Sequence, residues 1–303
     1  MDSIIQQLKQ LQSKYENVSF GAGISGGLDS MVLAEGLRRA EIPFRVLHLN
    51  HNWRGTASQA DADFVRQWCK NHQIQLNTQK ITKPLKTEDA ARAARLRFFE
   101  SMAKKYKLNY ILLAHHQNDA AETLLLQLLR GAGPDGLASL LPERTLGEIT
   151  LLRPFLEFRK SELETAAHSW QLDWREDSSN EDPQYFRNRI RHQLLPYLND
   201  ISPRDPVPLL ARTAEIIAGE NTFWQDSLPK EFPKKISVKE LKSKHSAFQR
   251  RFLRAWLESQ NIPTPDFQTL ERIRKLLSDR NPAKVNLRKD RHCRRRAGYL
   301  FLE

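Results

Sequence analysis

A short pattern that could bind a pyrophosphate stands near the N-terminus and reads Ser25-Gly26-Gly27-Leu28-Asp29-Ser30. Gly26 and Gly27 lack Cβ atoms, so backbone N–H groups there can approach an anion at the start of a following helix. The hydroxyls of Ser25 and Ser30 add donors for phosphate oxygens. Asp29 is unusual, because a carboxylate beside phosphates is repulsive unless a metal ion bridges them. The pattern therefore predicts Mg²⁺ held by Asp29 through the phosphates; the alternative is a glycine turn with Asp29 as a helix-capping acid.

A second phosphate-binding frame overlaps the first, because Gly21, Gly23 and Gly26 also spell the dinucleotide pattern G-x-G-x-x-G. That pattern requires a strand that ends before Gly21 and an acidic residue about 20 residues further on. Asn50 and His51 stand where the acid should be. A Walker A loop is excluded too, because the stretch contains no lysine. We therefore assign Gly21 and Gly23 to a tightly packed strand.

The elements that must position this loop alternate between short apolar runs and helical patterns. Strands are predicted at 18–24, 44–49, 76–81 and 108–114. Helices are predicted at 4–15, 28–40, 58–72, 87–106 and 119–130. This alternation predicts an α/β fold with a parallel sheet and helices on both faces. Ligands bind such sheets at the carboxyl ends of the strands, which here lead into residues 25–30, 50–55 and 115–123.

Beyond about residue 140 the alternation ends, and a second domain is predicted. The segments that follow are a helix at 159–170, a polar loop at 174–183, a basic segment at 186–192 and a proline-rich stretch at 196–208. We expect a first domain at 1–205 and a basic second domain, α/β or helical, at 206–303, with a connector helix at about 206–222. The second domain contains two amphipathic helices, at 247–260 and 267–277, and two strand-like segments near its end, which together indicate a small α+β module.

Charge and composition restrict the function classes. The chain has 48 Lys and Arg against 36 Asp and Glu, a net charge of +12 that favours a polyanionic partner such as nucleic acid. Its apolar runs are far shorter than the roughly 18 residues of a membrane-spanning helix, so no membrane association is expected. The two cysteines form neither a CxxC motif nor a disulfide framework, which predicts a cytoplasmic location.

The loop at 24–30 resembles the signature of the PP-loop ATP pyrophosphatases, which split ATP between its α and β phosphates and form an adenylate. Within them, seven segments in order are similar to the tRNA(Ile)-lysidine synthetase family. They read LNHNWRG at 49–55, EDAARAAR at 88–95, AHHQNDAAET at 114–123, RGAG at 130–133, RPF at 153–155, DSSN at 177–180 and RNRIR at 187–191. The last hundred residues resemble the second domain of that family only loosely.

The resemblance implies a Rossmann-like parallel sheet of the PP-loop ATP pyrophosphatase type, followed by a smaller α+β domain, in a short form without the third domain of longer members. It implies a ligase that uses ATP and Mg²⁺ to adenylate C2 of the wobble cytidine in the CAU-anticodon isoleucine tRNA. Lysine then displaces AMP to give lysidine, which changes codon specificity from AUG to AUA. Whether the enzyme is a homodimer is left open.

The resemblance also places the site residues. All six residues of the loop, with His51 and Arg92, are predicted to bind ATP. Attack on the α-phosphate needs charge neutralisation, for which Arg95 is preferred, although a solvated helix face is the alternative for both arginines. Asp119 and Glu122 lie three apart on one helix face and are predicted to bind the lysine ammonium or to activate its amine. The alternative for this pair is first-turn acids that answer the helix dipole.

Two basic segments are predicted to contact tRNA. The first contains Arg187, Asn188, Arg189 and Arg191, for which a charged helix face is the alternative. The second is the run at 288–296, of which Arg294 and Arg295 are the predicted contacts and a solvated edge strand is the alternative.

Two other functions compete with lysidine formation. A PP-loop tRNA thiolase would need a persulfide-forming cysteine or several thiolates on a cluster, which Cys69 and Cys293 do not provide. A noncatalytic, nucleotide-regulated tRNA-binding protein would not need Asp29, Asp119 and Glu122 together.

Overall fold

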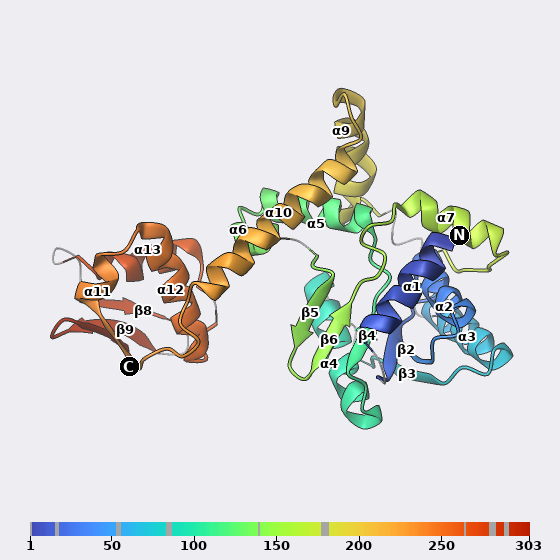
Figure 1. The fold of residues 1–303 in the computed structure, drawn as a ribbon, viewed down its shortest axis with the longest axis horizontal. Helices are drawn as coiled ribbons and strands as arrows, with labels where there is room; N and C mark the ends of the chain where they lie inside the picture. The colour runs from blue at the N-terminus through green and yellow to red at the C-terminus, as the bar shows by residue number, and fades with distance from the viewer. Residues whose placement is uncertain are drawn as a thin grey trace. The chain divides into compact units, whose positions relative to one another are not determined.

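A computed structural model describes residues 2–15, 18–52, 56–82, 87–138, 140–176, 182–263, 265–278, 283–287 and 291–303. Three predicted segments therefore lie partly outside the described residues, at 53–55, 177–180 and 288–290. The chain divides into two compact units, residues 1–219 and 220–303 (Figure 1). Each is described by itself.

The first unit is built on a six-stranded sheet in the order β3-β2-β1-β4-β6-β5. The strands are β1 Phe20–Gly23, β2 Phe44–Asn50, β3 Leu76–Lys80, β4 Tyr110–Leu112, β5 Glu143–Leu146 and β6 Ile149–Leu152. Every neighbouring pair is parallel except β5 and β6. The sheet confirms the predicted α/β fold and the four predicted strands, and it adds the β5–β6 hairpin, which the sequence did not reveal.

Helices cover both faces of this sheet. They are α1 Asp2–Lys14, α2 Leu28–Arg39, α3 Thr56–Asn71, α4 Glu88–Tyr106 and α7 Lys160–Ser169. Two further helices, α5 Gln117–Leu129 and α6 Pro134–Leu137, follow β4, and α5 packs against Ile190, Leu195 and Val207 of later helical segments. Side chains of α1, α2, α3 and α7 form one core with β1, while α4 packs on the other face through Phe98 and Phe99. A Cβ atom on Gly23 would lie 2.9 Å from the Phe99 ring, so Gly23 is a packed strand residue, as predicted. Four helical segments continue the chain: α8 Phe186–Arg189, the π-helix Ile190–Leu194, α9 Leu195–Ile201 and α10 Pro206–Asp226. The two units divide within α10.

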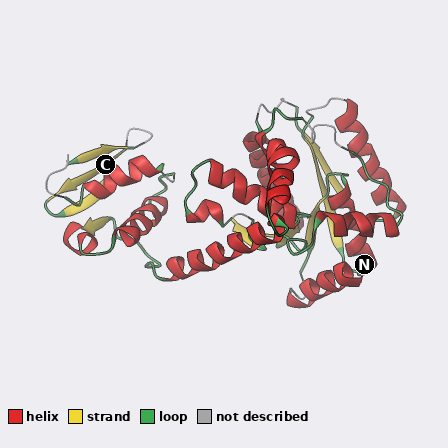
Figure 2. Cartoon of the chain, turned by 90° about the horizontal axis from the view of Figure 1, so that it is seen from above, coloured by secondary structure: helices red, strands yellow, loops and turns green. Residues whose placement is uncertain are grey.

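The second unit is a small α+β module with its helices and strands in two layers (Figure 2). Its elements are β7 Lys235–Ser237, α11 Val238–Lys242, α12 Ser246–Ser259, α13 Phe267–Lys275, β8 Lys284–Asn286, β9 His292–Arg296 and β10 Tyr299–Leu302. The sheet is antiparallel in the order β7-β10-β9-β8. It has two strands more than the sequence predicts, because β7 and β8 contain three residues each, too few to show an alternating pattern.

None of the helices in the described part of the chain combines the length and the hydropathy needed to cross a bilayer.

Candidate active site

The Ser-Gly-Gly-Leu-Asp-Ser loop joins β1 to α2, and its own groups fix its shape. Ser30 Oγ accepts hydrogen bonds from the N–H groups of Ser25 and Gly26, both at 3.1 Å. The same hydroxyl donates to Gly27 O at 2.8 Å. Gly26 has a φ of +97°, a conformation that favours glycine. Ser30 is therefore buried inside the loop, whereas Ser25 is exposed. The Ser25 hydroxyl lies 3.1 Å from Ser30 Oγ and accepts a hydrogen bond from Gly27 N–H at 3.3 Å.

The N-terminus of α2 offers the backbone donors that a phosphate needs. Gly27 is the N-cap and supplies no side-chain hydrogen bond. The first helical hydrogen bond runs from Met31 N–H to Gly27 O, so the amides before Met31 are not used within the helix. Leu28, the first helical residue, is half-buried against the core. The loop thus leads into a helix N-terminus of the kind that can bind an anion, and ATP binding there stays a prediction.

Asp29 has the geometry expected of a metal ligand. Its Oδ1 atom is buried and has no hydrogen-bond partner. Its Oδ2 atom lies 3.7 Å from His116 Nε2. A buried carboxylate oxygen without a donor fits a cation, and a carboxylate is a ligand that Mg²⁺ prefers. The alternative role, a helix-capping acid, finds no support, because α2 has no side-chain cap.

His116 links Asp29 to Asp119, a contact that the sequence did not predict. It is the N-cap of α5, and its Nδ1 accepts a hydrogen bond from Asp119 N–H at 3.4 Å. Because Nδ1 is the acceptor, the ring proton lies on Nε2, 3.6 Å from Asp119 Oδ2 and 3.7 Å from Asp29 Oδ2. Burial lowers the pKa of His116, but the two carboxylates outweigh it and raise that pKa above its usual value. The cap also starts α5 at Gln117, two residues before the predicted start.

Asp119 and Glu122 share one helix face, as their spacing predicts, and both are bound by arginines in this structure. Arg187 donates from Nε to Glu122 at 2.9 Å and from Nη2 to Asp119 at 2.9 Å. Arg191 donates to both Glu122 oxygens, at 2.6 and 2.8 Å. Glu122 is only 1% exposed. Burial alone would raise the pKa of Asp119. The interactions with His116, Arg187 and His115 have a larger, opposite effect, so the pKa of Asp119 lies below its usual value and this carboxylate is ionised.

The other members of the basic segment point elsewhere. Asn188 is buried and donates to Asp182 O at 2.9 Å. Arg189 is exposed and lies over the ring of Phe186. Arg187 and Arg191, predicted for tRNA, therefore belong to the carboxylate cluster in this conformation, while Arg189 is accessible to RNA. The sequence spacing could not show which of these side chains face the carboxylates, because the helix changes from α to π at Ile190.

Arg92 and Arg95 stand on α4 near this cluster. Both side chains reach solvent, and neither forms an ion pair with a described residue. Partial burial and the cation of Arg187 lower the pKa of both guanidinium groups, and Arg92 lowers that of Arg95 further. Neighbouring cations without carboxylate partners repel one another, and a bound polyanion would relieve this repulsion. The charge of the pair is compatible with phosphate, and the predicted roles of Arg92 and Arg95 stay predictions.

Two neutral histidines complete the surroundings. Burial first, and then Arg95, lower the pKa of His51 to about 4. Burial also lowers the pKa of His115 to about 3, against the opposing charge of Asp119. His115 Nδ1 accepts a hydrogen bond from Arg153 Nε at 3.2 Å. Burial lowers the pKa of Arg153 to about 10. Both rings are therefore uncharged at neutral pH.

His115 should make the first unit sensitive to acid. Its unfolded imidazole binds a proton below about pH 6.5, whereas the folded one stays neutral until about pH 3. Stability is therefore complete above pH 6.5 and falls as the pH decreases, by up to about 1.4 kcal/mol for each pH unit. We expect His115→Gln, which keeps an acceptor for Arg153, to flatten this slope between pH 6.5 and 4.5 in denaturant titrations. An unchanged slope would show that the buried ring does not stay neutral.

Arg294 and Arg295 lie on β9 in the second unit. Arg294 pairs with Glu303 at 2.8 Å, and Arg295 donates to Leu276 O at 3.1 Å. Both are half-buried, so each has a structural contact beside the predicted contact with tRNA.

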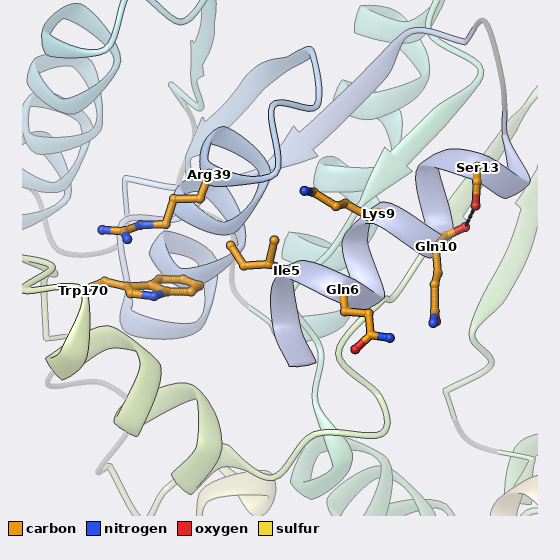
Figure 3. Close-up of a pocket in the computed structure, with 7 residues that line it drawn as sticks. All are labelled: Ile5, Gln6, Lys9, Gln10, Ser13, Arg39 and Trp170. Carbon is orange, nitrogen blue, oxygen red and sulfur yellow. Dashed lines mark hydrogen bonds between the residues drawn. The ribbon is translucent and has the colours of Figure 1, made fainter. Parts of the chain in front are cut away.

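A surface hollow of about 840 Å³ lies at the far end of α2, away from the loop. Figure 3 shows its lining residues, Ile5, Gln6, Lys9, Gln10, Ser13, Arg39 and Trp170. Arg39 ends α2, which is 12 residues and therefore about 18 Å long. The hollow contains none of the predicted site residues and is separate from the candidate active site.

The two cysteines are inaccessible. Cys69 is part of the core around β1, and Cys293 is part of the core of the second unit. Burial raises the pKa of each thiol to about 12. We expect neither to react with a thiol reagent at pH 8 in the native protein and both to react in guanidinium chloride. One equivalent of rapid labelling in the native protein would contradict this account.

The loop, the sheet and the helix end define a PP-loop protein, and the comparisons agree. Residues 1–198 match the model of a PP-loop domain, and residues 236–301 match that of a TilS substrate binding domain. The tRNA(Ile)-lysidine synthase of Thermosynechococcus vestitus is 33% identical over 269 residues, 85% of this chain and 78% of that protein. That of a Nostoc species is 32% identical and covers 87% of this chain and 84% of its own length. The chain belongs to the tRNA(Ile)-lysidine synthase family.

A solved structure shares the fold. It is a U34-tRNA thiolase from Methanococcus maripaludis with a [4Fe-4S] cluster, with a TM-score of 0.60 and 15% identity over 72% of this chain and 78% of that one. At this identity the likeness concerns the fold alone.

Proposed function

We propose that this member of the family adenylates C2 of the wobble cytidine in the CAU-anticodon isoleucine tRNA and then joins lysine there. The product, lysidine, would change codon specificity from AUG to AUA. The observation that supports this best is the partnerless Asp29 oxygen at an open helix N-terminus, linked through His116 to Asp119. It supports the proposal because donors for phosphate, a ligand for Mg²⁺ and a second acid would then share one edge of the sheet.

The first step would join ATP to the base. The amides at the start of α2 and the exposed Ser25 hydroxyl would hold the pyrophosphate part of ATP. Bound Mg²⁺ would neutralise charge on the phosphates. Asp29 would be its protein ligand, because the buried Oδ1 atom of Asp29 has no hydrogen-bond partner and a carboxylate oxygen is a ligand that Mg²⁺ prefers. Arg95 and Arg92 would stabilise the charge that develops as the C2 oxygen attacks the α-phosphate and pyrophosphate leaves.

The second step would bring lysine to the adenylated base. The lysine amine would form the new bond to C2 while AMP leaves with the former C2 oxygen. Asp119 and Glu122 already bind two guanidinium groups, so their environment suits a cation of the same charge. A lysine ammonium would replace part of the contacts that Arg187 and Arg191 make in this structure. Asp119, near His116, would then receive the proton that the amine loses.

The alternatives fit less well. A thiolase needs reactive sulfur, but the only two cysteines of the sequence are buried in separate cores with pKa values of about 12. A noncatalytic tRNA-binding protein would have no use for a partnerless acid beside a phosphate-binding helix end. The division at residues 205 and 206, a cytoplasmic location and a homodimer stay predictions.

Pyrophosphate release separates an enzyme from a noncatalytic binder. The full chain is mixed with ATP, MgCl₂ and an in vitro transcript of the CAU isoleucine tRNA, with no lysine present. We expect release of pyrophosphate that depends on the tRNA, because the base is the acceptor of AMP. Tight tRNA binding without release would contradict the proposed adenylation.

A further inference from the structure

The small sheet of the second unit has one face that packs on the helices and one that does not. Ile236, Val285, Cys293 and Leu300 are buried in the core with Leu253, Trp256 and Ile273 of α12 and α13. Side chains alternate between the two faces of a strand. The residues between these buried positions therefore share the opposite face, and the described ones there are exposed or half-buried.

Two aromatic residues lie in the middle of this opposite face, on β10. Phe301 is paired with Lys235 of β7 on one side and Arg294 of β9 on the other. Tyr299 is paired with Ser237 and Arg296 in the same way. Directly paired residues project from the same side of a sheet. We call these six residues, together with Lys284 beside Arg294, the aromatic sheet face.

The aromatic sheet face is strongly basic. It carries four cations, Lys235, Lys284, Arg294 and Arg296. The acid beside it is Glu303, which neutralises Arg294 at 2.8 Å. The Lys235 ammonium lies 5.8 Å from the centre of the Phe301 ring, and Tyr299 is 48% exposed. The face therefore presents a flat apolar ring next to exposed cations, the two features that a ligand with both flat apolar and anionic parts would contact.

We propose that the aromatic sheet face binds unpaired bases of an RNA strand, which stack on Tyr299 and Phe301. Two residues along a strand are about 7 Å apart, so the two rings can receive two different bases. Lys235 and Arg296 flank the rings and meet the phosphates, and Arg294 can do so where a phosphate replaces Glu303. This combination of aromatic stacking with flanking cations is the chemistry of single-strand recognition, whereas duplex RNA buries its base faces. The inference rests on the proposed function, because the bound strand would be an unpaired segment of the tRNA substrate.

The test measures RNA binding by the full chain, without ATP or lysine, so that it does not depend on catalysis. The probes are a fluorescein-labelled single-stranded RNA of about 12 nucleotides and the duplex of the same sequence. We expect Tyr299→Ala to weaken single-strand binding about tenfold and Tyr299→Ala with Phe301→Ala to weaken it further. Tyr299→Phe should bind like the original, because the ring remains. Tyr197→Ala is the matched control, since Tyr197 is 61% exposed on α9 and should have no effect.

Three results would overturn the proposal. Unchanged single-strand binding by the double variant would show that no base stacks there. Equal losses for duplex and single strand would show contact with the backbone only. Loss of binding to phosphatidylserine vesicles, with RNA binding intact, would assign the face to a membrane. Because Phe301 is half-buried, the folding of the double variant is first verified by circular dichroism. If the double variant is unfolded, the result for Tyr299→Ala alone decides the test. Failure of tRNA-dependent pyrophosphate release with intact stacking would refute the proposed function and leave this inference standing.

Discussion

Asp29→Asn is expected to reduce tRNA-dependent pyrophosphate release at least about a hundredfold while tRNA binding changes little. The substitution removes the charge that would hold Mg²⁺ against the phosphates, and loss of one such electrostatic contact has an effect of this order. Folding should be unaffected, because Asp29 Oδ1 has no hydrogen-bond partner to lose. Release is measured with a coupled pyrophosphate assay, and binding is measured by filter retention of labelled tRNA.

Asp63→Asn serves as the control for this prediction. Asp63 is exposed on α3 and pairs with Arg66 one turn away. Loss of this exposed charge should leave pyrophosphate release and tRNA binding unchanged. Parallel loss of tRNA binding and of thermal stability in Asp29→Asn would instead mean that Asp29 supports the fold of the loop.

Glu122→Ala is expected to destabilise the first unit by about 3–5 kcal/mol. The change leaves the guanidinium groups of Arg187 and Arg191 without the carboxylate that both bind, and removal of one partner from a buried ion pair has an effect of this size. Asp119 can compensate in part, since Arg187 already bonds to it at 2.9 Å. Unfolding is followed by circular dichroism in urea, under conditions where the variant is folded at the start.

A surface ion pair gives the matched comparison. Glu164 lies 3.8 Å from Lys160 on α7, and both side chains are 44% exposed. Glu164→Ala should therefore change stability by less than about 1 kcal/mol. Similar small losses for Glu164→Ala and Glu122→Ala would show that water reaches the carboxylate cluster and that the arginines are not held there.

Most of the catalytic fold could be predicted because its strands are buried. The runs that became β1, β2 and β4 are apolar and are separated by long helical patterns, which is the local signature of a parallel sheet. The hairpin of β5 and β6 escaped prediction because β5 is an edge strand whose first three residues are exposed. Its sequence, Glu-Arg-Thr-Leu, therefore has no apolar alternation to detect.

The sequence indicates residues for the candidate site, whose roles stay predictions, but it does not reveal the contacts between them. The spacing of Asp119 and Glu122 determines that they share a helix face. Their arginine partners lie 68 and 69 positions further along the chain. Contacts at that separation depend on tertiary packing. His116 was missed for a different reason, because a histidine is an uncommon N-cap. Ser30 was predicted to bind ATP, but its hydroxyl faces into the loop, a direction that only the backbone geometry reveals.

Incorporation of labelled lysine tests the central claim most directly. The full chain is incubated with ATP, MgCl₂ and [¹⁴C]lysine, and with transcripts of either the CAU isoleucine tRNA or a methionine tRNA with the same anticodon. The account predicts stable labelling of the isoleucine tRNA alone, with one AMP and one pyrophosphate formed for each lysine. Equal labelling of both tRNAs, or label in neither while pyrophosphate is released, would contradict it.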